Sequence, residues 1–247
     1  MRSPLTREHV LPRGLGGNWA PAGSSNALVL QNATCEPCRQ ITQKIEDECL
    51  RAMDNGRARL GLKRKDRRPA TMQAFITLPD GSTERRDVDS NEVLGAIGIP
   101  AYYEAGALTN RPIAAVYPCD YRIIVVAPAS QRLLRQSAKI EVRTSVNSRT
   151  FAQMLAKIAL GLTVAKFGIS GFEPLVRDLI LNNPDEYGHW VGGFAGMQVG
   201  ESPSKQFHEL QLLGTQQASA GIFIIVEIRL FAEFGGPTNY VVVGRPL

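Results

Sequence analysis

Glu8 and His9 are the residues of this chain whose types and spacing point most directly to chemistry. A carboxylate and an imidazole follow each other here, and Val10, Leu11 and Pro12 then lead into a glycine-rich turn. The unperturbed pKa of histidine lies near neutrality, which suits a general base. A glutamate oxygen is the kind of ligand that Mg²⁺ or Mn²⁺ prefers. The pair therefore predicts a catalytic base, His9, beside a metal ligand, Glu8.

Cys35 and Cys38 form a Cys-x-x-Cys pair at the start of a segment with helical periodicity. Their spacing is that of one half of a zinc knuckle, which needs four ligands in all. No cysteine precedes His9 in the sequence, so the other half of a knuckle is missing there. Three alternatives stay open: zinc held with ligands encoded upstream of Met1, loss of the zinc, or a redox-active pair.

These segments resemble the HNH endonuclease family, in particular a bacterial branch that reads Glu-His-Val-Ile-Pro, then Leu-Gly-Gly, then Cys-x-x-Cys. The matching stretches here are residues 8–12, 15–17 and 35–38. The resemblance implies a ββα-metal module in which His9 deprotonates a metal-positioned water that attacks a DNA phosphate. It also implies that Glu8 holds the metal, Mg²⁺ or Mn²⁺, which stabilises the charge on the phosphate.

The resemblance further implies an asparagine that orients the catalytic histidine. Asn26 matches it best by position and Asn32 is second, although asparagine in such a stretch is often a turn residue. Directly after the second cysteine the family usually has Asn or His, whereas this chain has Arg39. Arginine has no acceptor and repels a cation. Glu46 or Asp47 could replace the missing ligand if the helix turns one of them inward.

The positive charge of the chain is concentrated in its first quarter. Residues 1–70 hold 13 Lys and Arg against 7 Asp and Glu, whereas the remaining 177 residues hold 15 against 16. Such a patch can neutralise phosphates and release counterions, although a solvated basic linker has the same composition. The nucleic-acid contacts predicted on this ground are Arg57, Arg59, Lys63, Arg64, Lys65, Arg67 and Arg68.

The hydrophobic pattern predicts an α+β protein in three parts. The first is a small N-terminal module over residues 1–61, which the resemblance implies is of the ββα-metal, HNH-like type. A basic linker follows over residues 62–70, and residues 71–247 form a larger α+β domain with a mostly antiparallel sheet. Apolar residues at three- and four-residue spacing predict a helix in the module, from Pro37 to a C-cap at Asn55-Gly56.

In the larger domain, Pro79-Asp80-Gly81 predicts a hairpin turn between two strands, and residues 91–118 lack periodicity. Ser148 or Thr150 is expected to cap a long apolar helix that ends at Gly168. Lys157 lies on this helix, and its side chain is expected to face solvent or to form a salt bridge. The other expected elements are strands at 121–126, 138–146, 189–194, 209–213, 221–231 and 239–243 and a helix at 173–181.

Composition narrows the class of protein. A hydrophobic content of 44% and a charged content of 21% are ordinary for a globular protein. No apolar run approaches the roughly 18 residues that a membrane span needs. Without a visible secretory signal, and with four cysteines, the chain is expected in the reducing cytoplasm. Residues 71–247 are expected to serve target recognition, homodimer formation or inhibition of the module.

Two hypotheses follow from the sequence. The chain is either a metal-dependent DNA endonuclease of the HNH type or a nucleic-acid-binding protein with a degenerate HNH module that no longer cuts. Basic phosphate contacts serve both. The intact Glu8-His9 pair favours the nuclease, whereas Arg39 and the missing upstream cysteines favour the binding protein.

Overall fold

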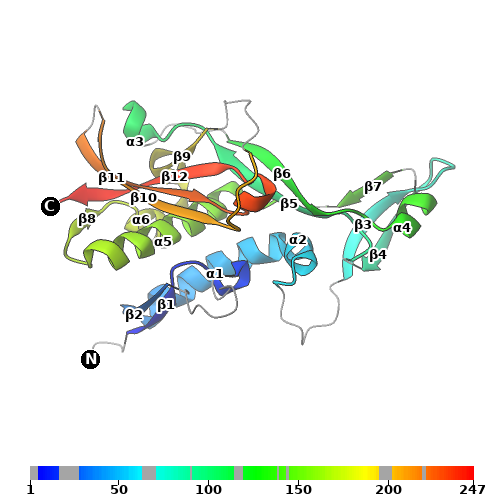
Figure 1. Cartoon of the computed structure of the whole chain (residues 1–247), viewed down its shortest axis with the longest axis horizontal. Helices are drawn as coiled ribbons and strands as arrows, with labels where there is room; N and C mark the ends of the chain where they lie inside the picture. Colours follow the sequence, from blue (N-terminus) through cyan, green and yellow to red (C-terminus); the bar gives the residue numbers. More distant parts are fainter. Residues whose placement is uncertain are drawn as a thin grey trace.

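The computed structural model describes most of the chain. The described residues are 5–16, 28–62, 71–89, 91–113, 119–137, 139–142, 145–194, 202–218 and 221–247. The protein is α+β with antiparallel sheets, as the sequence predicts. Figure 1 shows a main body of sheet and helices, with a small group of strands at one end of the molecule that long strands connect to the body.

The first elements come in the order strand, strand, helix, helix. They are β1 (Thr6–His9), β2 (Val29–Thr34), α1 (Glu36–Ala52) and α2 (Asp54–Arg59), with the short 3-10 helix η1 (Arg13–Leu15) between the strands. β1 pairs antiparallel with β2, so that Glu8 lies opposite Leu30 and His9 opposite Val29. The ββα order agrees with the expected module, and α1 buries one apolar stripe that includes Ile45 and Cys49.

The helix of the module ends earlier than the sequence predicts. Asn55 and Gly56 do not cap α1 but lie inside α2, where both are buried. A Cβ atom on Gly56 would lie 2.1 Å from Cγ1 of Ile97, so the glycine allows α2 to pack closely against the neighbouring strand. The Asn55 amide donates to the carbonyl of Leu94 at 2.7 Å. Tertiary packing, rather than a C-cap, therefore explains why this position of the chain has asparagine followed by glycine.

The main sheet is entirely antiparallel, in the strand order β10-β11-β12-β8, with β9 also pairing with β12. Its strands are β8 (Phe172–Pro174), β9 (Val191–Gly193), β10 (Glu209–Ala218), β11 (Gly221–Arg229) and β12 (Thr238–Pro246). The shorter elements around it are α6 (Arg177–Leu181), η2 (Pro184–Glu186), α7 (Tyr187–Trp190) and η3 (Ala232–Phe234). The helix expected at 173–181 is thus shorter, because its first residues pair with the end of β12.

The helix α5 (Ser148–Phe167) lies between this sheet and α1, as Figure 1 shows. Asn147 caps it, rather than Ser148 or Thr150, since its side chain accepts from the backbone N–H groups two and three residues further on, those of Arg149 and Thr150. Gly168 ends it as predicted. α5 is long and apolar enough to cross a membrane, but 56% of its apolar window is buried inside the protein, as in a core helix.

A second region consists of the strands β3 to β7 (residues 71–142), and the hydrophobic pattern of the sequence predicts only some of them. β5 (Gly95–Tyr102) pairs with β6 (Cys119–Ala127), and β3 (Thr71–Thr77) pairs with β4 (Thr83–Asp89) and β7 (Lys139–Val142). The short helices α3 (Gly106–Thr109) and α4 (Gln131–Gln136) accompany them. The hairpin turn before β4 agrees with the prediction. Residues 95–102 were expected to be irregular; they form a strand without alternation because all eight residues are buried.

The hydrophobic core joins the two ends of the chain. One cluster includes Val10 and Leu15 from the first strand and turn, Met53 from the end of α1, and side chains of α5 and the main sheet such as Phe151 and Val241. A separate, smaller cluster lies beneath β3 and β4. The residues of the predicted module therefore share their core with the larger domain, and the predicted domain boundaries stay a prediction.

His208 ties the first turn of the chain to the main body. Its Nε2 atom lies 2.7 Å from the carbonyl oxygen of Leu15, and its Nδ1 atom accepts from the N–H of Phe231 at 2.9 Å. A carbonyl only accepts, so the proton of the ring is on Nε2 and the imidazole is neutral. Burial lowers the pKa of His208 to about 4.

We expect this histidine to make the protein less stable in acid. The unfolded chain binds a proton at His208 below about pH 6.5, whereas the folded protein resists it until about pH 4, so stability falls as the pH drops through this window. The loss should approach about 3 kcal/mol. Urea denaturation at pH 7, 5.5 and 4 measures it. His208→Gln should flatten this dependence, and an equally steep dependence in that variant would contradict the assignment.

Candidate functional site

The predicted catalytic pair lies at the end of β1, with its two side chains directed to different partners. Neighbouring residues of a strand project to opposite faces. Glu8 accordingly meets Lys157 of α5, whereas His9 meets Arg13 of η1. The carboxylate and the imidazole are thus neighbours in the sequence, but each has its own set of contacts in the structure.

Lys157 is the centre of a buried polar cluster. Its side chain is only 7% exposed, and its ammonium group lies 2.5 Å from Oε1 of Glu8 and 2.7 Å from Oε1 of Glu46. It also donates to the backbone carbonyl of His9. The salt bridge expected for Lys157 is present, but it is buried and has two carboxylates. Three oxygens from β1 and α1 therefore converge on one cation from α5, and we call this group the Lys157 cluster.

The Lys157 cluster carries one more negative charge than positive charge when both carboxylates are ionised. Burial raises the pKa of Glu46, and the nearby charges of Glu8 and Asp47 raise it further, while Lys157 lowers it. Glu46 is the residue that α1 turns inward, whereas Asp47 is exposed. Of the two substitute metal ligands considered from the sequence, only Glu46 is therefore placed beside Glu8.

His9 is neutral and partly accessible at the surface. Burial lowers its pKa, and the positive charges of Arg13 and Lys157 lower it further against the opposing charge of Glu8. The Nε of Arg13 donates to Nε2 of His9 at 2.8 Å. The ring proton is then on Nδ1, which is buried and faces no hydrogen-bond partner within the described part of the chain. The lone pair that a general base would use is thus held by Arg13.

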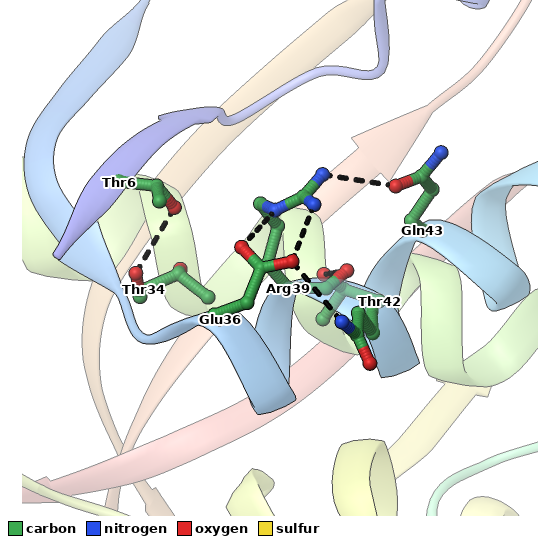
Figure 2. A network of polar contacts seen from close by, with 7 residues as sticks. Thr6, Thr34, Glu36, Arg39, Thr42 and Gln43 are labelled. Atoms are coloured by element: carbon green, nitrogen blue, oxygen red, sulfur yellow. Dashed lines mark hydrogen bonds and ion pairs between the residues drawn. The ribbon is translucent and has the colours of Figure 1, made fainter. Parts of the chain in front are cut away.

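Arg39 occupies the position after the second cysteine, and its partners are clear in Figure 2. Its guanidinium forms a bidentate ion pair with Glu36, with distances of 2.6 and 2.8 Å, and also donates to Gln43 at 3.0 Å. Hydrogen bonds from Arg39 and Gln40 hold the pKa of Glu36 at about 2. Arg39 therefore takes part in a network along the surface of α1, which is a structural role and not that of a metal ligand.

Cys35 and Cys38 lie at the junction of β2 and α1. Cys35 is the N-cap of the helix, Cys38 falls in the first turn, and both are partly exposed. Hydrogen bonds from Cys38 lower the pKa of Cys35, and the positive charge of Arg177 adds to this effect. Sharing of its thiol proton with Cys35, together with burial, raises the pKa of Cys38.

Zinc binding by this pair stays a prediction. Over the residues that the structure describes, no group of three or more His, Cys, Asp or Glu side chains is arranged to hold a metal ion. The structure thus brings Cys35 and Cys38 together but places neither of them with the Lys157 cluster in a single set of donors.

The two described members of the predicted nucleic-acid contacts have partners within the protein, and their part in nucleic-acid binding stays a prediction. Arg57 is buried and donates to the carbonyls of Gly14 and Leu50 and to Asp54. Arg59 donates to two carbonyls on loops beside the strands β4 and β6. Nothing in the sequence indicates these internal contacts, because charge alone does not show which arginines have partners within the protein. Lys63, Arg64, Lys65, Arg67 and Arg68 lie outside the described residues.

The structure describes one of the two asparagines that could orient His9. Asn26 lies outside the described residues. Asn32 lies on β2 with a φ of +51°, at an irregularity in the pairing with β1, and is exposed. Asparagine tolerates this left-handed conformation better than most residues, so Asn32 has a backbone reason for its identity.

Lys157 is the site residue that reasoning from sequence missed. The signal was present, because Lys157 is the single charged residue between Arg149 and Lys166 in an otherwise apolar helix. A lone charge among apolar neighbours on both sides indicates a buried group with a partner.

Comparisons with protein-family models, with curated proteins and with solved structures gave no match. The function is therefore inferred from the contacts within this chain.

We expect Lys157→Met to destabilise the protein strongly. The variant keeps a side chain of similar length but leaves Glu8 and Glu46 facing each other without a cation, which should cost about 3–5 kcal/mol in urea denaturation. Adding Glu8→Gln and Glu46→Gln should restore most of this loss, because the repulsion is then removed.

Lys166→Met is the matched control, since Lys166 is on the same helix but exposed. This control should change stability by less than about 0.5 kcal/mol. An equal effect of the two lysine substitutions would show that the Lys157 cluster contributes nothing.

Proposed function

We propose that this protein binds nucleic acid through its basic N-terminal region and carries an HNH-like module that does not cut. The observation that supports this most is the position of the Lys157 ammonium between Glu8, Glu46 and the carbonyl of His9. Two carboxylates and a carbonyl are oxygen donors of the kind that Mg²⁺ or Mn²⁺ takes. The Lys157 ammonium offsets one of the two negative charges and already lies between these oxygens, so they do not fit a divalent ion in addition.

Displacing Lys157 would be costly. Its side chain would have to leave a buried position in the middle of α5, and the buried ammonium would need new partners. Metal-dependent hydrolysis would require that movement as well as release of His9 from Arg13. Both requirements weigh against cleavage and are independent of the substitution at Arg39.

Nucleic-acid binding is supported by charge. The excess of Lys and Arg in the chain falls within residues 1–70, and the densest run is Lys63 to Arg68. Arg7 on β1 and Arg13 on η1 are exposed. A concentrated positive surface attracts the phosphate backbone regardless of sequence. DNA is the partner that the family resemblance suggests, and we place the protein in the cytoplasm.

The HNH endonuclease is the second candidate, and one observation favours it. His9 is neutral and lies beside an exposed arginine at a strand end. A neutral imidazole can accept a proton, and a nearby guanidinium can bind a phosphate oxygen. This hypothesis needs Lys157 to release Glu8 when DNA binds.

We expect duplex DNA to bind with a steep dependence on salt, measured by fluorescence anisotropy. Each phosphate contact that is lost should flatten the slope of log affinity against log salt by about 0.9. The variant Lys63→Gln/Arg64→Gln/Lys65→Gln should therefore weaken binding to unrelated sequences alike. The matched control is Arg85→Gln/Arg132→Gln/Arg135→Gln, which removes the same charge from exposed positions elsewhere. Equal slopes for both triple variants would contradict a nucleic-acid interface in the basic run.

We also expect supercoiled plasmid to stay intact in Mg²⁺ or Mn²⁺ under conditions in which the protein is bound to it. Nicking by the wild-type protein that disappears in His9→Ala would reject the non-cutting module and establish the second candidate. Removing a general base typically lowers the rate by about 10²- to 10⁴-fold, so the difference would be easy to see.

A further inference from the structure

The junction between β2 and α1 places two sulfur atoms side by side. Cys35 ends the connection from the strand, and Cys38 lies one helical turn further on. Residues three apart in a helix have Cβ atoms about 5–6 Å apart, and an N-cap residue has the freedom to move closer. The Cys38 thiol already hydrogen-bonds to the sulfur of Cys35. A disulfide bond would require the two sulfur atoms to approach to about 2.05 Å.

The surroundings of the pair differ from those of the other cysteines. Cys35 and Cys38 are both partly exposed, so a small molecule can reach them. Cys49 is fully buried and lies on the same helix, about 16 Å along its axis from Cys38, which is too far for a disulfide. Cys119 is also partly exposed, but it lies on the strand β6, whose pairing partner is β5, and not at the helix start that carries the pair. The geometry therefore selects one pair from the four cysteines of the chain.

A positive charge accompanies the pair. Arg177 opens α6, which packs against α1, and its guanidinium acts on both sulfur atoms. Cations close to a cysteine favour the thiolate, which is the nucleophile in thiol–disulfide exchange. The Cys-x-x-Cys at this helix start therefore has a neighbouring arginine that favours thiol–disulfide exchange.

We propose that Cys35 and Cys38 form a reversible disulfide by exchange with a small-molecule disulfide such as glutathione disulfide. The thiolate of Cys35 attacks one sulfur of the external disulfide, forms a mixed disulfide and expels one thiolate. The thiol of Cys38 then gives its proton to solvent and attacks the sulfur of Cys35, which expels the second thiolate. The protein dithiol loses two electrons and two protons, and the external disulfide becomes two thiols.

This inference does not depend on the proposed nucleic-acid function, because the exchange involves neither the basic run nor the Lys157 cluster. It does bear on the zinc site predicted at the same two sulfur atoms. A zinc ion held by both thiolates would block the exchange, so zinc and disulfide compete for this pair and one experiment can separate them.

The test uses the full chain, treated with a chelator and then equilibrated across a series of glutathione and glutathione disulfide ratios. Free thiols are alkylated, the protein is digested with trypsin, and the peptides are weighed. Residues 14–39 carry both Cys35 and Cys38, residues 45–51 carry Cys49, and residues 87–122 carry Cys119. We expect the first peptide to escape alkylation and to be lighter by two hydrogen atoms in oxidising buffers, while the other two stay alkylated.

The variants keep the proposal falsifiable. Cys38→Ser should stop the reaction at the mixed disulfide of Cys35 with glutathione, whereas Cys49→Ser, the matched control, should behave like the wild type. The proposal is overturned if both thiols of the first peptide remain alkylated at every ratio, or if the wild type also stops at the mixed disulfide. One further pair of results would also overturn the proposal. In one sample, added zinc binds to these thiols of the chelator-treated protein, and in a second sample without zinc the pair still forms no disulfide.

Discussion

One buried ammonium group fixes the arrangement of the first quarter of this protein. Lys157 reaches from the central helix α5 to the carboxylates of Glu8 on β1 and Glu46 on α1, and to a carbonyl of β1. Charges removed from water need well-placed partners. The strand, the helix and α5 can therefore take few relative positions that satisfy all four groups. The shared apolar core and the bond from His208 to the carbonyl of Leu15 act in the same direction.

The same group decides what chemistry is open to the module. An ammonium and a divalent ion both attract carboxylates, but they differ in what they can do next. A metal ion can accept a water or phosphate oxygen in its open positions, whereas the three N–H bonds of a lysine end at the protein oxygens around it. In this chain, Lys157 thus offsets negative charge on the carboxylates without supplying the Lewis acidity that a metal ion would bring. The surface charge that attracts nucleic acid does not depend on this difference.

Much of the fold could be predicted from the sequence because many of its elements follow local rules. The long helix that ends at Gly168 and the hairpin around Gly81 both rest on periodicity and turn residues. The failures have a common cause in tertiary packing. β5 has no alternation because both of its faces are buried, and Asn55 and Gly56 resemble a C-cap although they meet neighbouring strands.

The site was less predictable for a similar reason. Sequence identified Glu8 and His9 as a pair with chemical potential, but it did not show that Glu8 pairs with the distant Lys157 or that His9 accepts from Arg13 on η1. The burial of Arg57 against Gly14 could not be separated from surface charge by composition. Lys157 was detectable only as a charge in an apolar stretch. A polar residue gains its role from what surrounds it, and those surroundings are assembled over more than a hundred residues.

The contact between Gly56 and Ile97 also has a consequence for how this sequence can vary over time. The space between α2 and β5 has no room for even a methyl group at position 56. A larger residue there would require a smaller one at position 97, so related sequences should change these two positions together or not at all. Such a pair would be a mark of common ancestry that survives even where the residues at the chemical site have diverged.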